Sequence, residues 1–237
     1  MSKDPNREPP SEDMAETREP QYHCCFDTLR ESGRAAFGLM SNHTWHSDPK
    51  RLTFLLARYK FVAKMFSGMS RVLEVGCADA FATRIVRQEV ASLTATDFDP
   101  VFIDDAIQGM DQRWRFEAKV HDMLSGPMPG PFDGAYSLDV IEHITAEHEE
   151  AFLGNMAASL TPTGVIILGT PSLQSQVYAS PPSREGHVNC KDAQGLKELV
   201  GRFFHNVFIF SMNDEVVHTG YYPMAQYLIA LGCTRKL

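Results

Sequence analysis

The sequence has no tract of positive charge. Its 237 residues carry 22 lysine and arginine side chains against 30 aspartate and glutamate side chains, which gives a formal net charge of -8. Proteins that bind nucleic acid over a wide surface usually present a basic face, so this balance argues against a nucleic-acid partner. The chain also lacks an apolar run long enough to cross a bilayer, and its first ten residues are polar, unlike a secretory signal. We therefore expect a cytoplasmic protein with no membrane partner.

The cysteines are few, and their spacing indicates neither a metal site nor a disulfide framework. The five cysteines show no metal-ligand spacing, and their odd number does not suit a disulfide framework. A reducing compartment is the simpler setting, and no metal site is expected. The remaining composition, 43% hydrophobic and 22% charged, is typical of a globular protein, and the length suffices for one α/β domain with a sizeable core.

Composition divides the chain into three parts. Residues 1–20 are charged and rich in proline, which predicts a disordered tail. Residues 21–66 predict a helical arm, because a helix start at Asp48 and Pro49 is followed by an apolar helical stripe. We expect this arm to act as a lid over the domain formed by residues 67–237.

Strand and helix patterns alternate through that domain, which predicts an α/β fold with a mostly parallel sheet and helices on both faces. Two final strand-like runs, at 206–211 and 226–232, have no strong helix between them and predict an antiparallel hairpin at the sheet edge. The expected earlier strands are 71–76, 92–97, 116–121, 132–138 and 164–170, with helices at 80–89, 101–109, 146–160 and 192–202.

Residues 71–81 form the most informative segment. An apolar strand pattern ends in an acid and a glycine, a turn of small residues follows, and a helix opens after it. About twenty residues later a second strand ends at Asp97, where an acid can accept hydrogen bonds from both hydroxyls of a ribose. Asp99 is the alternative acid, and a carboxylate here could instead cap the helix at Pro100. The pattern predicts a nucleoside-cofactor pocket at the carboxyl ends of parallel strands.

Three further motifs follow in order, VHDM at 120–123, FDGAYSLDVIEH at 132–143 and LTPTGVIILGTPS at 160–172. With the first motif they make residues 50–237 similar to class I S-adenosylmethionine (SAM) methyltransferases, in particular to the small-molecule group with a V-L-[DE]-V-G-C-G-x-G motif. The resemblance implies a Rossmann-like sheet of seven strands whose last two form the hairpin. It also implies SAM as the cofactor and S-adenosylhomocysteine as its product.

The resemblance implies a set of cofactor contacts at the strand ends. Arg58, in an Arg-Tyr pair, matches an arginine that binds the SAM carboxylate, although a solvated helix arginine would look the same. Alanines at 78 and 80 replace the usual glycines and disfavour positive φ, so a small shift of this loop is expected. The other implied contacts are Glu74, Gly76, Ala78, Asp97, Phe98, Asp122, Met123, Leu138 and His143, the last with a capping or packing role as its alternative.

The acceptor side is less defined. The insert at 172–191 crosses the expected substrate side and carries His187, a candidate general base or substrate ligand, while His46 on the arm and Asp139 are the other catalytic candidates. The resemblance favours methyl transfer to a small-molecule oxygen, such as a phosphonate, carboxylate or sugar, and leaves a homodimer open. A nucleic-acid or protein methyltransferase and a non-catalytic SAM-binding module are the alternatives. A nicotinamide enzyme would need two further glycines in the first turn.

Overall fold

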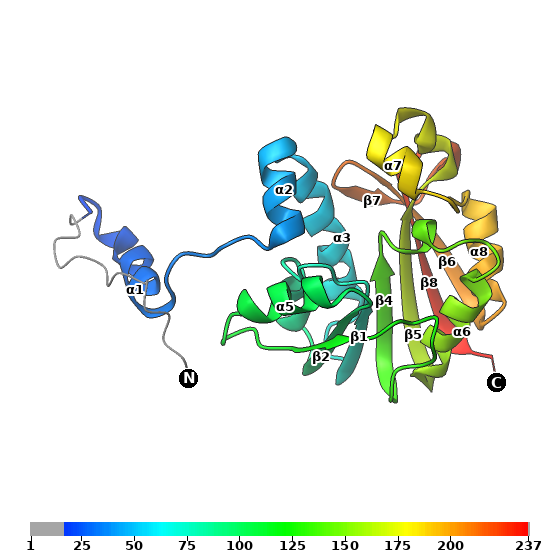
Figure 1. Ribbon diagram of the computed structural model, residues 1–237, viewed down its shortest axis with the longest axis horizontal. Coiled ribbons are helices and arrows are strands. Elements are labelled where there is room, and N and C mark those ends of the chain that lie inside the picture. Colours follow the sequence, from blue (N-terminus) through cyan, green and yellow to red (C-terminus); the bar gives the residue numbers. More distant parts are fainter. Residues whose placement is uncertain (1–16, 237) are drawn as a thin grey trace. The chain divides into compact units, whose positions relative to one another are not determined.

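The computed structural model describes residues 17–236, which divide into two units (Figure 1). The first unit extends to Ala36 and contains a 3₁₀ turn η1 (Pro20–Tyr22) and helix α1 (His23–Ser32). Helix α1 ends at Gly33, whose φ of 72° suits glycine. Most of the tail predicted at 1–20 lies outside the described residues. The second unit begins at Phe37 and contains all the strands.

The second unit is built on one sheet with the order β3-β2-β1-β4-β5-β8-β6-β7. The first five strands run parallel, and β8 lies antiparallel between β5 and β6. The predicted α/β class, with a mostly parallel sheet and antiparallel C-terminal strands, is therefore confirmed. The strand bounds are β1 (Arg71–Val75), β2 (Ser92–Asp97), β3 (Glu117–Val120), β4 (Phe132–Leu138), β5 (Leu160–Pro171), β6 (Phe204–Asn213), β7 (Val216–His218) and β8 (Tyr227–Arg235).

The sheet has eight strands, whereas the sequence predicted seven. The additional strand is β7, which pairs antiparallel with the end of β6. Asp214, with a φ of 50°, makes the tight turn between them. Three residues are too few to give a periodic pattern, so this strand had no sequence signal. A 3₁₀ turn η4 (Tyr222–Met224) then leads into β8.

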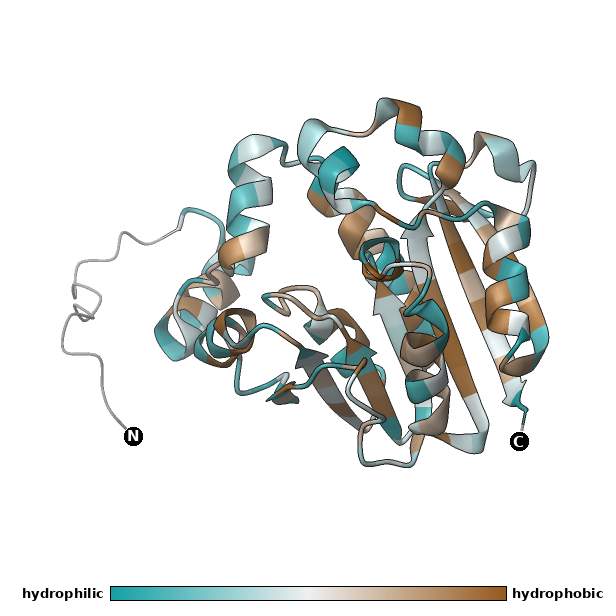
Figure 2. Cartoon of the chain, turned by 45° about the vertical axis from the view of Figure 1, so that its right-hand side comes forward, coloured by the Kyte–Doolittle hydropathy of each residue, from teal (hydrophilic) through white to brown (hydrophobic). Residues whose placement is uncertain are grey.

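Helices cover both faces of the sheet, as predicted. One face packs against α3 (Arg51–Met65), α4 (Thr83–Arg87) and α5 (Pro100–Gln108), and the other against α6 (Glu149–Ala158) and α8 (Ala193–Gly201). Successive strand side chains alternate between these two cores, since Val72 joins the first and Leu73 the second. Figure 2 shows the resulting concentration of apolar residues along the strands.

The start of helix α3 differs from the one that the sequence pattern predicted. Asp48 does not start α3 but closes helix α2 (Leu39–Ser47), where its N–H donates to the Thr44 carbonyl. The remaining short elements are η2 (Ile141–His143), η3 (Leu173–Tyr178) and α7 (Pro181–Gly186). Within residues 17–236, every helix falls short of the length and apolar character needed to cross a bilayer.

Candidate functional site

The carboxyl ends of β1, β2, β3 and β4 meet at one edge of the sheet. The parallel register fixes this, because Val75 lies opposite Thr96, and Thr96 opposite Lys119. Loops that leave adjacent parallel strands in this way form the crevice where α/β proteins bind ligands. The sequence motifs at residues 76–82, 97–99, 121–123 and 138–143 are therefore neighbours in space.

The β1–α4 loop, residues 76–82, has an unusual backbone. Gly76 has a φ of 79°, and a Cβ there would lie 2.3 Å from the Val140 side chain, so only glycine fits. Ala78 and Ala80 have φ values of 45° and 51°. Both alanines thus adopt the left-handed conformation that glycine favours, and the loop keeps a glycine-like path without the glycines.

Replacing Ala78 by glycine is expected to stabilise the protein. Relief of a left-handed alanine is worth about 1–2 kcal/mol, and the greater freedom of an unfolded glycine offsets about 0.5–1 kcal/mol of this. Ala82, with a φ of -85°, is the matched control, and Ala82→Gly should destabilise by roughly 0.5–1 kcal/mol. Urea unfolding of both variants measures the difference. Equal destabilisation by the two substitutions would show that Ala78 is unstrained.

Asp97 lies buried at the end of β2, beside this loop. Its Oδ2 accepts a hydrogen bond from the Ala78 N–H at 2.9 Å, and its Oδ1 accepts one from the Asp99 N–H at 3.0 Å. Asp99 instead caps α5, because its Oδ1 accepts from the Val101 N–H. The capping role thus falls to Asp99. Each Asp97 oxygen keeps a lone pair for a ligand, and the adjacent Phe98 side chain is 74% exposed.

The third strand end is joined to the second by the backbone. The His121 N–H donates to the Asp97 carbonyl, which places Asp122 and Met123 next to the end of β2. Asp122 is exposed, and one of its oxygens accepts from the Leu124 N–H at 2.9 Å. The Met123 side chain is buried in the core shared with α6.

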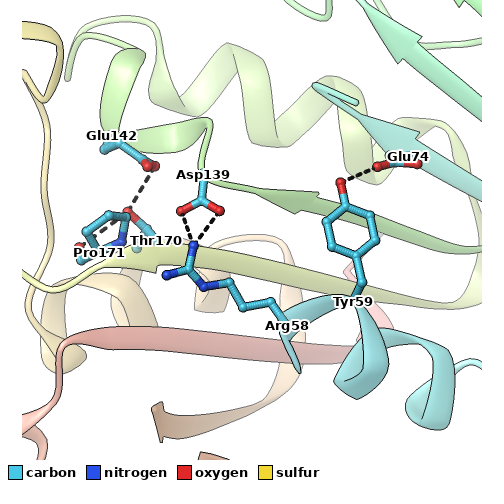
Figure 3. A network of polar contacts seen from close by, with 7 residues as sticks. All are labelled: Arg58, Tyr59, Glu74, Asp139, Glu142, Thr170 and Pro171. Carbon is cyan, nitrogen blue, oxygen red and sulfur yellow. Dashed lines mark hydrogen bonds and ion pairs between the residues drawn. The ribbon is translucent and has the colours of Figure 1, made fainter. Parts of the chain in front are cut away.

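Glu74 is committed to the protein interior. Its Oε1 accepts a hydrogen bond from the Tyr59 hydroxyl at 2.7 Å (Figure 3). Its Oε2 accepts one from the Thr83 hydroxyl, also at 2.7 Å. Burial raises the pKa of Glu74, and these two hydrogen bonds partly oppose the rise. Both oxygens are therefore engaged, and the side chain ties α3 and α4 to β1. Tyr59 had only a core signal in the sequence, since it lies on the apolar stripe of its helix.

Arg58 and Asp139 form a two-point ion pair at the end of β4. The Arg58 Nη1 atom lies 2.8 and 2.7 Å from the two Asp139 oxygens (Figure 3). The Arg58 guanidinium also lies 3.8 Å from the centre of the Tyr227 ring. Burial lowers the pKa of Arg58, but the charge and hydrogen bond of Asp139, together with Tyr227 and Glu142, outweigh burial and the pKa is raised. Among the described residues, Arg58 Nε and Tyr227 Oη are buried without a hydrogen-bond partner.

Glu142, His143 and His187 form a cluster next to this pair. One possible ligand atom from each residue lies within 4.8 Å of the others, and the two imidazole rings are 5.2 Å apart. Glu142 is 1% exposed, and burial together with the Asp139 charge raises its pKa to about 8. Burial and the neighbouring His143 lower the pKa of His187. The structure thus brings His187 of the insert against His143 of the fourth-strand motif.

Helix α2 is docked on the β1–α4 loop. Its Leu39 N–H donates to Asp105 Oδ2 at 2.7 Å, and its Ser41 N–H donates to Asp79 Oδ2 at 2.6 Å. Asp105 and Asp79 therefore cap the free N–H groups at the start of this helix. Neither acid had a sequence signal for this capping role. His46 is exposed in the last turn of α2, and within residues 17–236 it makes no hydrogen bond or ion pair with Asp139 or His187.

Comparison with known proteins finds methyltransferases that resemble part of this chain. Residues 72–164, from β1 into β5, match the family model described as a methyltransferase domain. The ubiquinone biosynthesis O-methyltransferase of Xanthomonas campestris pv. campestris (strain B100) is 24% identical over 156 residues. This match spans 60% of the chain and 62% of the relative, which is less than two thirds of the relative's length.

Two solved structures share the fold. The N-methyltransferase NodS from Bradyrhizobium japonicum WM9, in complex with S-adenosyl-L-homocysteine, superposes with a TM-score of 0.63 at 18% identity, over 91% of this chain and 99% of NodS. The CurJ carbon methyltransferase superposes with a TM-score of 0.58 at 14% identity, over 81% of this chain and 61% of that chain. These three relatives are named for oxygen, nitrogen and carbon methylation, so the shared fold does not fix the acceptor atom.

Proposed function

We propose that this chain is a class I SAM-dependent methyltransferase that transfers a methyl group from SAM to an oxygen atom of a small-molecule acceptor. The main support for this proposal is that the β1–α4 loop, Asp97 and Asp139 lie together at one edge of the sheet. The likeness to an O-methyltransferase favours oxygen. The net charge of -8 disfavours the alternative of a nucleic-acid acceptor.

The residues at this edge fit SAM. Asp97 has free lone pairs for the ribose hydroxyls, and the exposed Phe98 offers an apolar face to the adenine. Asp122 is the acid for the adenine amino group, and the Met123 N–H is the donor for a ring nitrogen. The orphaned Nε of Arg58 supports a second partner for this guanidinium, and the SAM carboxylate suits it. Gly76, Ala78 and Leu138 line the path between these groups, whereas Glu74 supports the loop from below.

Bound SAM would supply an electrophilic methyl group, which the acceptor oxygen attacks in line as S-adenosylhomocysteine leaves. The chain mainly contributes alignment and exclusion of water. An acceptor hydroxyl must also lose its proton. His187 is the first candidate to receive that proton or position the oxygen, because its Nδ1 is held by Gln176 and its other nitrogen is left free. Asp139 is engaged by Arg58, and His46 would act only through movement of α2.

Calorimetry is the direct test of the cofactor. SAM is expected to bind with a Kd of roughly 1–50 μM, which is ordinary for a ligand held by several hydrogen bonds and a buried ring. NAD should bind far more weakly, because the first turn has one of the three glycines that a pyrophosphate needs. Tighter binding of NAD than of SAM would overturn the cofactor assignment. Methyl-labelled SAM offered with carboxylates, phosphonates, sugars and phenols then tests the acceptor class.

A further inference from the structure

We propose that Glu142, His143 and His187 form a binding site for one divalent first-row transition ion, such as Mn²⁺, Co²⁺ or Zn²⁺. The three residues come from η2 and from the turn after α7, and one ligand atom of each lies within 4.8 Å of the others. A carboxylate with two imidazoles favours such an ion over Mg²⁺ or Ca²⁺, which prefer oxygen ligands alone.

The first argument is the burial of Glu142. Its side chain is 1% exposed, and its Oε2 accepts one hydrogen bond from the Thr170 hydroxyl at 3.1 Å (Figure 3). Within residues 17–236, no lysine or arginine forms an ion pair with it, because the nearby Arg58 is paired with Asp139. A buried carboxyl group held by one side-chain hydrogen bond gains from a further partner, and a bound metal ion would supply it.

The second argument is the orientation of the two histidines. His143 Nδ1 lies 2.8 Å from the Gly186 carbonyl oxygen, and His187 Nδ1 lies 2.9 Å from Gln176 Oε1. Both oxygens can only accept, so each neutral imidazole carries its proton on Nδ1 and leaves Nε2 with a free lone pair. Histidines that bind metals are usually oriented by such an oxygen on the other ring nitrogen.

The third argument is that the insert is fixed in place without an ion. The N–H groups of Val188 and Asn189 both donate to the Glu142 carbonyl, at 2.8 and 3.0 Å. Lys191 Nζ lies 2.6 Å from Glu149 Oε2 on α6, and the Lys191 carbonyl accepts from the Leu173 N–H. The two ends of the insert are thereby joined to each other and to α6. His187 is held beside Glu142 by backbone contacts, which makes the cluster a pre-formed site.

The role of the ion rests on the proposed function, whereas its binding does not. Asp139, at the end of β4, lies three residues before Glu142, so an ion at the cluster would be close to the methyl-transfer site. It would bind the acceptor oxygen and lower the pKa of a hydroxyl there. Because His187 Nε2 would then bind the ion, the hydroxyl proton passes to water and not to His187, the oxygen–methyl bond forms, and the methyl–sulfur bond breaks. This favours acceptors that bind as an oxygen anion, such as phenols.

Co²⁺ titration of the chelator-treated full chain, without SAM or acceptor, tests the site through visible absorption and stoichiometry. One ion per chain is expected, with affinity about 100-fold or more weaker in His187→Ala and Glu142→Gln, because each removes a ligand. His205→Ala, on the exposed side of β6, is the matched control and should bind as the wild type does. Wild-type affinity in His187→Ala, or no stoichiometric binding by the wild type, would overturn the site.

Two further measurements keep the result interpretable. Gln176→Leu leaves all three ligands in place and should weaken Co²⁺ binding by about 10- to 100-fold, which tests the same site if His187→Ala does not fold. Chelation should abolish methyl transfer while leaving SAM binding intact, and Mn²⁺ or Co²⁺ should restore it. Transfer that resists chelation would overturn the role of the ion. If the protein did not bind SAM before chelator treatment, the proposed function itself would be contradicted.

Discussion

Replacing Asp97 by alanine is expected to weaken SAM binding by about 1.5–3 kcal/mol, or roughly 10- to 150-fold, because the ribose hydroxyls lose a charged acceptor. The same substitution should also lower the free energy of unfolding by about 1–3 kcal/mol. The second effect follows from the structure, since the buried carboxylate accepts hydrogen bonds from the N–H groups of Ala78 and Asp99. Calorimetry measures the first quantity and urea unfolding the second.

Asp99→Ala is the matched control for this experiment. It removes the carboxylate that caps α5, so it should cost about 1 kcal/mol of stability and leave SAM affinity nearly unchanged. Asp97→Asn separates the two roles of Asp97, because an amide keeps one acceptor oxygen and loses the charge. If Asp99→Ala abolished SAM binding while Asp97→Ala left it intact, the ribose acid would be Asp99.

The strand ends could be predicted because each depends on a short segment of sequence. Five strand patterns, four of which are followed by a helix signal, predict a parallel sheet, and parallel strands end at the same edge. Asp97 could therefore be placed beside the β1–α4 loop from the positions of two strands alone. The choice between Asp97 and Asp99 needed coordinates, because both acids lie near a helix start and only the hydrogen bonds show which one caps it.

The contacts across the site had no such local signal. Arg58 and Asp139 are 81 residues apart, and the pairing of His143 with His187 joins a motif to an irregular insert. Metal-ligand spacing in sequence is informative only where ligands share one helix or turn, and this cluster draws on two separate segments. The capping role of Asp79 also had no sequence signal, because an acid in a turn of small residues is common. Only the structure shows that the Ser41 N–H of α2 donates to it.

Removing residues 1–47 is expected to reduce kcat by about 100-fold or more while the remaining domain stays folded, because reacting groups lose their alignment and the site admits water. Within α2 only Ser41 is buried, so neither core cluster loses a member. The N-terminal amides of this helix are capped by Asp79 and Asp105, and Phe37 packs on Phe81 with ring centres 5.0 Å apart. A lid formed by α2 would therefore act directly on the β1–α4 loop, which the proposed function places against SAM.

The boundary between the two structural units supplies a matched pair of deletions. Removing residues 1–36 deletes the first unit and keeps α2, whereas removing 1–47 deletes both, so the difference in kcat between the two proteins isolates α2. Asp105→Ala is a milder form of the second deletion, because it removes one of the two caps on α2 without shortening the chain. It should raise KM and lower kcat less than the deletion does. Circular dichroism and SAM calorimetry on each protein establish that the domain is intact. Equal kcat in the two truncated proteins would mean that α2 is not the lid.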